Sequence, residues 1–229
     1  MKKITILTLF KDVVANATNF SILKKAKANK KVKINVVDFR LFSKNKHKKV
    51  ADTPYGGGAG MVLSLQPIVD AIKAYTTKNS HVVLLSPQGK KFNQTTAKQY
   101  AKSKKDLVLI CGHYEGFDQR IINYVDEVIS IGDYVLTGGE LPAAIITDAV
   151  VRLLNGVITK QSLNDESFEN NLLDYDSYTK PLNFQNYSVP KILLSGNHKL
   201  IKEFRQKNKI TKTKKQRPDL FSKYAKTKK

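Results

Sequence analysis

Hydrophobic residues in the first two thirds of the chain fall into short runs that alternate with segments of helical periodicity. The runs typical of buried strands lie at residues 4–10, 32–39, 82–85, 107–110 and 127–131. Segments with helical spacing or helix-start signals lie between them, at residues 11–31, 66–72, 93–103 and 117–124. Strands that alternate with helices in this way predict an α/β fold with a parallel sheet.

The pattern changes towards the carboxyl end. Residues 141–154 are apolar on almost every side, and a helix of that kind is buried, either in the protein or in a subunit interface. Asn155-Gly156 then gives a helix-stop signal. From residue 159 to about residue 190 the apolar period is lost and Asn, Asp, Ser and Tyr dominate, so we expect a linker or an ordered loop there.

Glycines mark the ends of several predicted strands. Ten of the 12 glycines lie between Gly56 and Gly139, in four groups, of which three follow an apolar run. Open α/β sheets bind ligands at the carboxyl ends of their strands, so these glycines predict one ligand-binding crevice. Ordinary tight turns are the alternative. The central stretch, residues 129–142, contains neither G-x-G-x-x-G nor a P-loop motif, which disfavours the usual dinucleotide and triphosphate sites.

Composition adds a strongly basic charge. The 229 residues carry 40 Lys and Arg against 19 Asp and Glu, a net charge of +21. Thirteen of the basic residues lie between Lys199 and Lys229, where only Glu203 and Asp219 are acidic. This distribution favours a polyanionic partner, most simply nucleic acid, held by a basic helical appendage. The alternative explanation for the excess of basic residues along the whole chain is a lysine-rich proteome. For the last ten residues alone, the alternative is a frayed, solvated tail.

Other classes of protein are disfavoured. The single cysteine, Cys111, excludes an internal disulfide and a multi-cysteine metal site. No stretch reaches the ~18 apolar residues of a membrane span. The first three residues lead directly into a strand-like run with no signal-peptide cleavage site. We therefore expect a soluble cytoplasmic protein with one larger domain and a small appendage.

Several long motifs occur along the chain in a fixed order. They are PYGGGAGM at 54–61, LSPQG at 85–89, CGHYEG at 111–116, SIGDYVLTGGELP at 130–142, ESF at 166–168, LLD at 172–174, YTKP at 178–181, LSGNH at 194–198 and RP at 217–218. On these motifs the chain closely resembles the bacterial tRNA (guanine-N1)-methyltransferases of the SPOUT superfamily, from Ile4 to about Leu220. Members of that family methylate the guanine at position 37 of tRNA, just 3′ of the anticodon.

The resemblance implies a fold that composition does not show. We expect a SPOUT-type α/β domain at residues 1–158, whose C-terminal part forms a trefoil knot, an exception to the usual connection rules. Residues 159–176 would form an interdomain linker and active-site loop, and residues 177–229 a small basic helical domain that holds tRNA. The family works as a homodimer with each active site shared between two subunits, and neither a membrane nor DNA is expected as a partner.

The resemblance also implies a cofactor, S-adenosylmethionine, bound in the knot as the methyl donor. Its contacts, carried over by motif, are Leu85, Ser86, Pro87, Gly112, Glu115, Ser130, Ile131, Gly132, Asp133, Tyr134, Val135, Leu136, Gly138, Gly139 and Pro142. This set coincides with the glycine-lined crevice. Glu115 would contact the guanine or the cofactor, and a turn-capping carboxylate is its alternative use. The family is associated with Mg²⁺, although no spacing of residues here points to a metal site.

Methylation at N1 of guanine requires removal of the N1 proton, and a carboxylate within hydrogen-bond reach can act as the base. The family has an aspartate directly before the Ser-Phe pair, and this chain has Glu166 there. Asp165 is the alternative base, one residue upstream. The family's catalytic arginine matches Arg152, which would stabilise negative charge on O6; pairing with Asp148 on the same helix face is the alternative.

Further residues are matched to substrate binding. They are Tyr55, Gly57 and Gly58 in a loop that lets RNA approach closely, Asp174 and His198. The runner-up function is a non-catalytic RNA-binding relative of the same fold, favoured only by the Asp-to-Glu change at position 166. A generic nucleotide-binding α/β protein is weaker still, since no lysine is aimed at a triphosphate.

Overall fold

The computed structural model describes residues 1–227, with the side chain of Lys160 left out. The chain divides into two compact units, Met1–Ile158 and Thr159–Lys229. The last two residues of the expected tRNA-binding domain, Lys228 and Lys229, lie outside the described residues.

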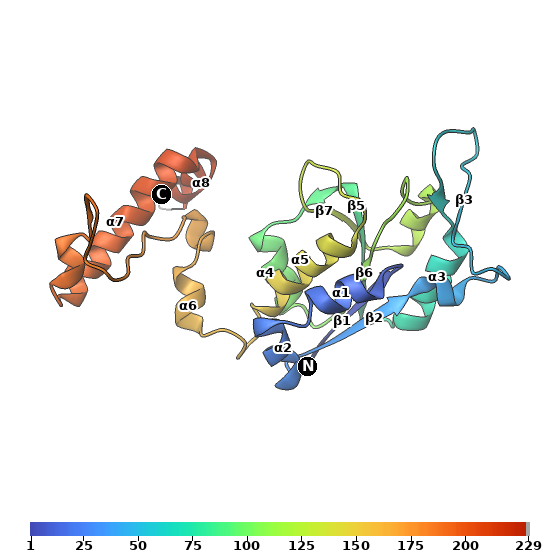
Figure 1. Ribbon diagram of the computed structural model, residues 1–229, viewed down its shortest axis with the longest axis horizontal. Helices are drawn as coiled ribbons and strands as arrows, with labels where there is room; N and C mark the ends of the chain where they lie inside the picture. The colour runs from blue at the N-terminus through green and yellow to red at the C-terminus, as the bar shows by residue number, and fades with distance from the viewer. Residues whose placement is uncertain (228–229) are drawn as a thin grey trace. The chain divides into compact units, whose positions relative to one another are not determined.

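The first unit is built on a five-stranded parallel sheet (Figure 1). Its strands, in spatial order, are β2 (Val32–Asp38), β1 (Lys2–Thr8), β6 (Asp106–Ile110), β5 (Ser80–Lys91) and β7 (Glu127–Ser130). Neighbouring strands all pair in the parallel sense. The parallel α/β architecture predicted from the alternation of strands and helices is therefore confirmed.

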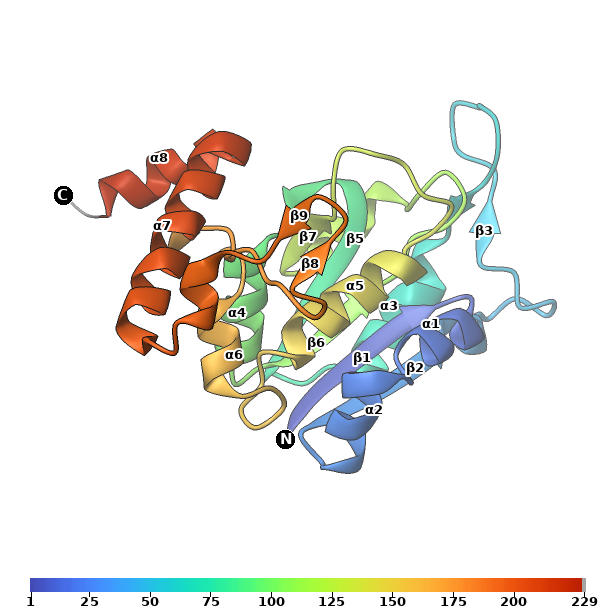
Figure 2. The same cartoon turned by 60° about the vertical axis from the view of Figure 1, so that its left-hand side comes forward.

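Helices cover both faces of this sheet (Figures 1 and 2). One face carries α1 (Lys11–Ala17), α2 (Ser21–Ala28), α4 (Gln94–Lys102) and α5 (Glu140–Val151), and the other carries α3 (Leu65–Tyr75) with the 3₁₀ helices η1 (Phe39–Phe42) and η2 (Gln119–Tyr124). Successive residues of a strand point to opposite faces. In β6, Leu109 accordingly belongs to the core under α5, and Ile110 to the core under α3. Each such fully buried side chain contributes about 1.5–3 kcal/mol.

Three element boundaries differ from the sequence prediction. Residues 11–31 form two helices rather than one, because Thr18 ends α1 by donating its hydroxyl to Val14 O at 2.8 Å. The strand predicted at 82–85 continues to Lys91 through an irregularity between Leu85 and Lys90. Gly89 permits this continuation, since a Cβ there would lie 2.5 Å from Ile129 N. The helix predicted at 117–124 is a 3₁₀ helix that begins at Gln119.

A two-stranded ribbon, β3 (Ala51–Asp52) with β4 (Val62–Leu63), carries the first glycine cluster. The loop between the strands projects from the first unit in Figure 1. Gly56, Gly57, Gly58 and Gly60 all have positive φ, between +77° and +125°. Side-chain-bearing residues rarely adopt this backbone conformation, which explains why four glycines lie so close together.

The second unit is built from short elements and two longer helices. They are α6 (Lys160–Asp165), η3 (Glu169–Asn171), the hairpin β8 (Asn183–Phe184) and β9 (Tyr187–Ser188), η4 (Lys191–Leu194), α7 (His198–Gln216) and α8 (Pro218–Lys226). The segment in which apolar periodicity is lost thus contains ordered elements. Leu172, Thr213, Leu220 and Tyr224 are buried in this unit.

Candidate functional site

A cavity of about 560 Å³ opens at the carboxyl ends of β5, β6 and β7. Its walls come from residues 84–88 within β5, at the irregularity in that strand, from residues 112–117 after β6, from residues 131–139 after β7, and from the first turn of α5. All the residues matched to the cofactor site line this cavity, with the exception of Asp133. Of the four glycine groups that predicted a crevice, Gly112 with Gly116 and Gly132 with Gly138-Gly139 line this cavity, whereas Gly89 and the cluster at residues 56–60 do not. The predicted crevice is therefore present, but it is formed by two of the four groups.

Two glycines bring separate segments into backbone contact at the base of the cavity. Gly139 N donates a hydrogen bond to Gly112 O at 2.7 Å, which joins the turn before α5 to the end of β6. A Cβ at Gly139 would lie 2.6 Å from Cys111 Cα, and a Cβ at Gly112 would lie 2.8 Å from Phe117 Cε2. Real Cβ atoms do not approach other atoms so closely. Glycine is thus favoured at position 139 by the neighbouring backbone and at position 112 by the ring of Phe117.

The loop of residues 131–139 is fixed at its outer side by a charged pair. Asp133 Oδ2 forms an ion pair with Lys91 Nζ of β5, so its side chain is turned away from the cavity. Next to it, the ring of Tyr134 packs against the Cα of Gly132, where a Cβ would overlap the ring. Ser130 Oγ donates to Gly132 O at 2.9 Å. The structure thus gives Asp133 a role in holding the loop.

A buried carboxylate lies under the Gly138-Gly139 turn. Glu140 is the first residue of α5 and is 6% exposed, and Thr8 Oγ1 at the end of β1 donates to its Oε1 at 2.6 Å. Thr8 Oγ1 also accepts from Phe10 N at 2.9 Å. Burial, and next the Glu140 carboxylate, raise the pKa of the Cys111 thiol well above its usual value. Cys111 is therefore not a candidate nucleophile.

Replacing Thr8 with valine should destabilise the first unit by about 1–3 kcal/mol, because it leaves a buried carboxylate oxygen and a backbone N–H without partners. Thermal unfolding is expected to shift down by roughly 3–10 °C. The matched control is Thr5→Val on the same strand, since Thr5 is also buried but its hydroxyl has no interaction with the described residues. An equal loss in both variants would contradict the assigned role of the Thr8 hydroxyl.

The glycine-rich loop between β3 and β4 approaches the cavity only at its carboxyl-terminal end. Tyr55 is fully exposed, and Gly57 and Gly58 lie at the tip, away from the residues that line the cavity. Glu115 N donates to Met61 O at 3.0 Å, and a Cβ at Gly60 would lie 2.6 Å from Glu115 Cγ. Glu115 thus connects the loop to the cavity wall.

The residues matched to catalysis are divided between the two units. Arg152 is half-buried at the carboxyl end of α5 in the first unit, and its N–H donates to Asp148 O at 3.1 Å. Asp165 and Glu166 lie at the end of α6 in the second unit, which also holds Asp174 and the exposed His198 at the start of α7. Asp165 Oδ1 accepts from Lys209 Nζ at 3.1 Å.

Sequence reasoning missed several residues of this region. His113, Thr137, Gln88 and Phe117 line the cavity, although none was matched to the cofactor site. Their position inside or beside the matched motifs was the available signal. His113 Nδ1 is buried and has no hydrogen-bond partner among the described residues. In the second unit, the lysines that hold Asp165 and Asp174 were also missed, since pairing across some 40 residues leaves no local pattern.

Residues 1–227 contain neither a cluster of metal ligands nor a helix suited to cross a membrane. No group of three or more His, Cys, Asp or Glu side chains within this range is arranged to hold a metal ion. Within the same range, none of the helices combines the length and the apolar character that crossing a membrane requires.

The fold and cavity define an α/β protein with a ligand-sized cavity at the carboxyl edge of a parallel sheet and a second, basic helical unit. A family model described as tRNA (Guanine-1)-methyltransferase TrmD matches residues 1–223. The chain belongs to this family of SPOUT methyltransferases.

Relatives agree with this assignment over almost their whole length. The chain is 61% identical over 224 residues to a tRNA (guanine-N(1)-)-methyltransferase of Malacoplasma penetrans, covering 98% of this chain and 99% of the relative. It is 52% identical over 227 residues to a protein of the same name from Ureaplasma urealyticum, covering 99% and 100%. A third, from Mycoplasmopsis pulmonis, is 51% identical over 224 residues, covering 98% of each chain.

Proposed function

We propose that this protein transfers a methyl group from S-adenosylmethionine to N1 of the guanine at position 37 of tRNA. The observation that carries the proposal is the cavity at the carboxyl edge of the sheet, because motifs separated by up to 57 positions in the sequence, from Leu85 to Pro142, meet in its wall. The family assignment supports the same reaction. The proposal includes the trefoil knot of the family, with the loops that surround the cavity as its crossing segments.

The cavity fits a cofactor that has an adenine, a ribose and an amino acid part. Gly112, Gly132, Gly138 and Gly139 line the cavity, and their lack of a side chain lets a ligand approach the backbone closely. Leu85, Ile131 and Leu136 give apolar contact for a planar base. When bound, the cofactor supplies a methyl group that is already activated on a sulfonium sulfur. The protein then has to position the donor and acceptor in line.

Proton removal from guanine N1 falls to the second unit in this proposal. Glu166 accepts the N1 proton, with Asp165 as the alternative base, and Arg152 stabilises the negative charge that develops on O6. Asp174 and His198, together with the glycine-rich loop that contains Tyr55, Gly57 and Gly58, contact the RNA. Residues 159–176 thus act as the active-site loop, and residues 177–229 hold the tRNA.

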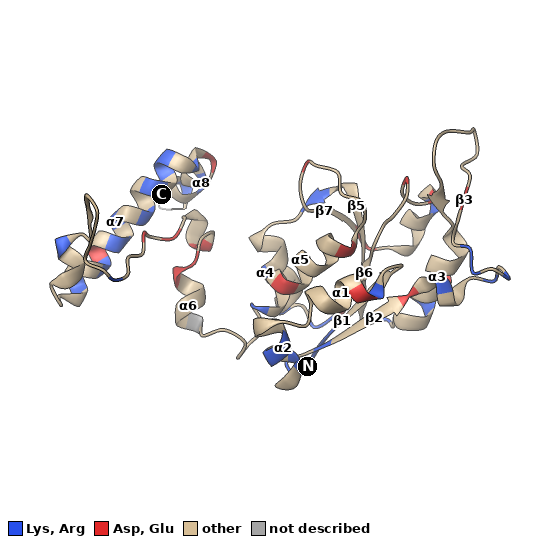
Figure 3. Ribbon diagram, in the orientation of Figure 1, with Lys and Arg blue, Asp and Glu red and all other residues tan. Residues whose placement is uncertain are grey.

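The charge of the second unit supports RNA binding. Figure 3 shows Lys and Arg along α7 and α8. Exposed lysines on these helices are Lys199, Lys202, Lys207, Lys214, Lys215, Lys223 and Lys226. Contacts of lysine with phosphate release counterions, so affinity for tRNA should fall steeply with salt.

A homodimer is part of the same proposal. Helices α1 and α5 pack together, and Val13, Leu141 and Ile145 on them remain 44–53% exposed, with Phe10 just before α1. An apolar face of this kind on a helix that is otherwise buried favours a subunit interface. A second copy would cover it, and each active site would combine the cavity of one subunit with the second unit of its partner.

The deciding experiment is methyl transfer from S-adenosylmethionine to an unmodified tRNA transcript with guanine at positions 36 and 37, with Mg²⁺ and with EDTA, followed by mapping of the product base. We expect 1-methylguanine at position 37, and no product on a transcript with adenine there. Tight binding of both ligands without transfer would contradict the proposal and favour the non-catalytic RNA-binding alternative.

A further inference from the structure

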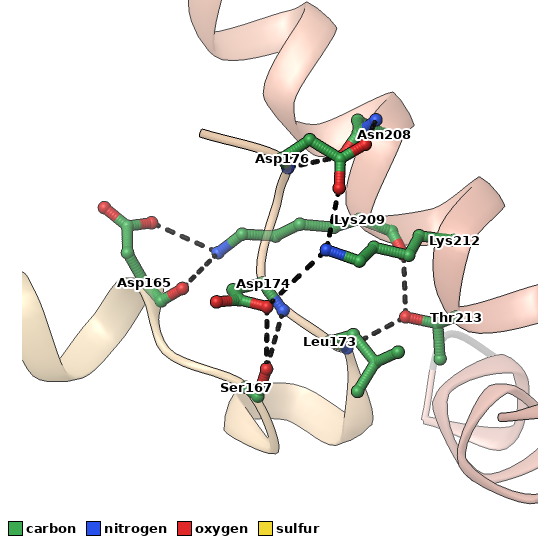
Figure 4. Close-up of polar contacts among 9 residues, drawn as sticks. All are labelled: Asp165, Ser167, Leu173, Asp174, Asp176, Asn208, Lys209, Lys212 and Thr213. Atoms are coloured by element: carbon green, nitrogen blue, oxygen red, sulfur yellow. Dashed lines mark hydrogen bonds and ion pairs between the residues drawn. The ribbon is translucent and has the colours of Figure 1, made fainter. Parts of the chain in front are cut away.

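In the second unit, the acidic segment of residues 165–176 lies along α7, and its three aspartates face lysines of that helix (Figure 4). Lys209 Nζ lies 3.1 Å from Asp165 Oδ1 and also donates to Asp165 O at 3.2 Å. Lys212 Nζ lies 2.8 Å from Asp176 Oδ1 and 3.8 Å from Asp174 Oδ1. The segment that carries Glu166 is therefore held at both ends by ion pairs.

Uncharged groups of α7 complete the attachment. Asn208 accepts from Asp176 N at 2.8 Å and donates to Asp176 Oδ2 at 2.8 Å, so it binds both the backbone and the side chain of one residue. Thr213 Oγ1, which is fully buried, accepts from Leu173 N at 2.8 Å and donates to Lys209 O at 2.7 Å. We call Asn208, Lys209, Lys212 and Thr213 the α7 clamp.

The four residues of the α7 clamp lie on one face of the helix. Residues three and four positions apart lie on the same side of an α-helix, which brings residues 208, 209, 212 and 213 together. The side chains of Lys209 and Lys212 are only 11% and 23% exposed. Lys209 Nζ also lies 5.4 Å from the centre of the Tyr175 ring, over which Arg205 stacks at 4.5 Å. These two lysines are thus occupied by the segment, unlike the exposed lysines on the rest of α7.

The turn inside the segment is one that needs external support. Phe168, Asn170 and Asn171 have φ values of 73°, 50° and 58°. A left-handed conformation costs a residue with a side chain roughly 1–2 kcal/mol, and such conformations persist where surrounding contacts fix them. Within the turn, Ser167 Oγ donates to Asp174 Oδ1 at 2.8 Å and Phe168 N donates to Leu172 O at 2.6 Å.

We propose that the α7 clamp positions the active-site loop for proton removal, and that Asp165 is an anchor of this loop and not the base. This inference rests on the function proposed above. Lys209 and Lys212 act through the loop, so they are positioning residues that do not contact the guanine. The competing assignment makes Lys209 and Lys212 phosphate-binding residues for tRNA, and the two assignments predict opposite effects on rate and affinity.

The test compares Lys212→Met with Lys207→Met, an exposed lysine of the same helix outside the clamp. A misplacement of about 1 Å can cost 10²-fold in rate. We therefore expect Lys212→Met to lower the single-turnover rate of methyl transfer roughly 10–100-fold and to change tRNA affinity less than about threefold. Lys207→Met should do the reverse, with weaker tRNA binding, a shallower salt dependence and a normal rate at saturating tRNA.

Two further variants distinguish a positioning role of Lys212 from a general loss of stability. Lys212→Arg keeps the charge and should recover most of the rate. Asp176→Asn combined with Lys212→Met should be no slower than Lys212→Met alone, because both changes remove one interaction. Additive losses in the double variant would overturn the inference, as would a Lys212→Met enzyme with normal rate and weakened tRNA binding.

The order of the loop can be followed without any activity. The chain contains no tryptophan, so Phe168→Trp introduces a single indole fluorophore into the strained turn. Its anisotropy should be high in otherwise unchanged protein and should drop when Lys212→Met is added. Unchanged anisotropy would overturn the inference. If wild-type protein makes no 1-methylguanine, the proposed function fails, while this measurement still decides whether the clamp orders the loop.

The ion pair between Lys212 and Asp176 also predicts the pH range over which the α7 clamp holds the loop in place. The hydrogen bonds from Lys212 and then Asn208 lower the pKa of Asp176, and the bond to Asp176 raises the pKa of Lys212. A depressed aspartate pKa stabilises the folded arrangement above its ordinary value, and this contribution is lost as pH falls through the depressed pKa. The indole anisotropy of the Phe168→Trp variant should therefore stay constant from pH 9 to pH 5 and fall only below pH ~4.

Discussion

Replacing Glu166 with alanine is expected to lower the single-turnover rate of methyl transfer 10²- to 10⁴-fold, the range that positioned general bases contribute. The N1 proton of guanine has to leave for the methyl group to be accepted, and Glu166, the base that we propose, lies at the end of α6. Affinities for tRNA and for S-adenosylmethionine should change less than about threefold, since the carboxylate acts on the reacting atom. Rapid-quench assays at saturating tRNA measure the rate.

The matched control is Asp165→Ala, which removes the neighbouring carboxylate. Because Asp165 is held by Lys209 Nζ at 3.1 Å, we expect a smaller loss of about tenfold or less, through a looser active-site loop. Glu166→Asp, which restores the residue type of the family, should retain substantial rate. A large loss in Asp165→Ala with a normal rate in Glu166→Ala would exchange the two roles.

The sheet and its cavity could be predicted because their signals are local. The buried strands give short apolar runs, and β6 shows this most clearly, since Leu107 to Ile110 are all buried. The glycine at position 139 marks a place where two backbones touch, and glycine is the residue that permits this. The position of the site could be predicted without knowing the order of the strands, because the carboxyl ends of parallel strands share one edge of the sheet.

The second unit and the fixation of the loops could not be predicted in the same way. Asp133 lies inside a matched motif, yet its side chain pairs with Lys91 on another strand. Asp165 and Lys209 are 44 positions apart, and nothing near either residue indicates the pair. Among the described side chains of residues 159–194 only Leu172 is buried, so the order of these short elements depends on hydrogen bonds such as that from Leu173 N to Thr213 Oγ1. Polar contacts of this kind leave no periodic pattern in the sequence from which they could be predicted.

The contacts that shape the cavity differ in kind from the contacts that hold the proposed active-site loop, and this difference matters for function. Close packing shapes the proposed cofactor cavity, since a Cβ at Gly139 would meet the backbone of Cys111 and a Cβ at Gly112 would meet the ring of Phe117. Ion pairs and hydrogen bonds on partly exposed side chains hold the active-site loop, and those are weaker and sensitive to salt. The proposed base therefore lies on a segment held by polar contacts, while the cavity is shaped by close packing.

Gly139→Ala is expected to abolish cofactor binding and to destabilise the first unit. The added Cβ would lie 2.6 Å from Cys111 Cα and 2.7 Å from Gly112 N, so the start of α5 has to move away from β6 and the 2.7 Å bond from Gly139 N to Gly112 O is broken. Forced overpacking of this kind costs about 3 kcal/mol, which lowers the melting temperature by roughly 6–12 °C. A cavity wall displaced by about 1 Å should weaken S-adenosylmethionine binding by 10²-fold or more. Calorimetric titration and thermal unfolding with and without S-adenosylmethionine measure both effects, and in the variant the ligand should no longer raise the melting temperature.

Gly196→Ala in the second unit is the matched control. Gly196 has φ +68° with open space around its Cα, so alanine there strains the backbone by roughly 1–2 kcal/mol but meets no other atom. Gly139 has the opposite combination, an ordinary φ of −84° and no space. The control should keep normal S-adenosylmethionine affinity despite its strain. If Gly139→Ala also binds the cofactor normally, the contact between the turn before α5 and the end of β6 does not shape the cavity, and the cofactor must bind elsewhere.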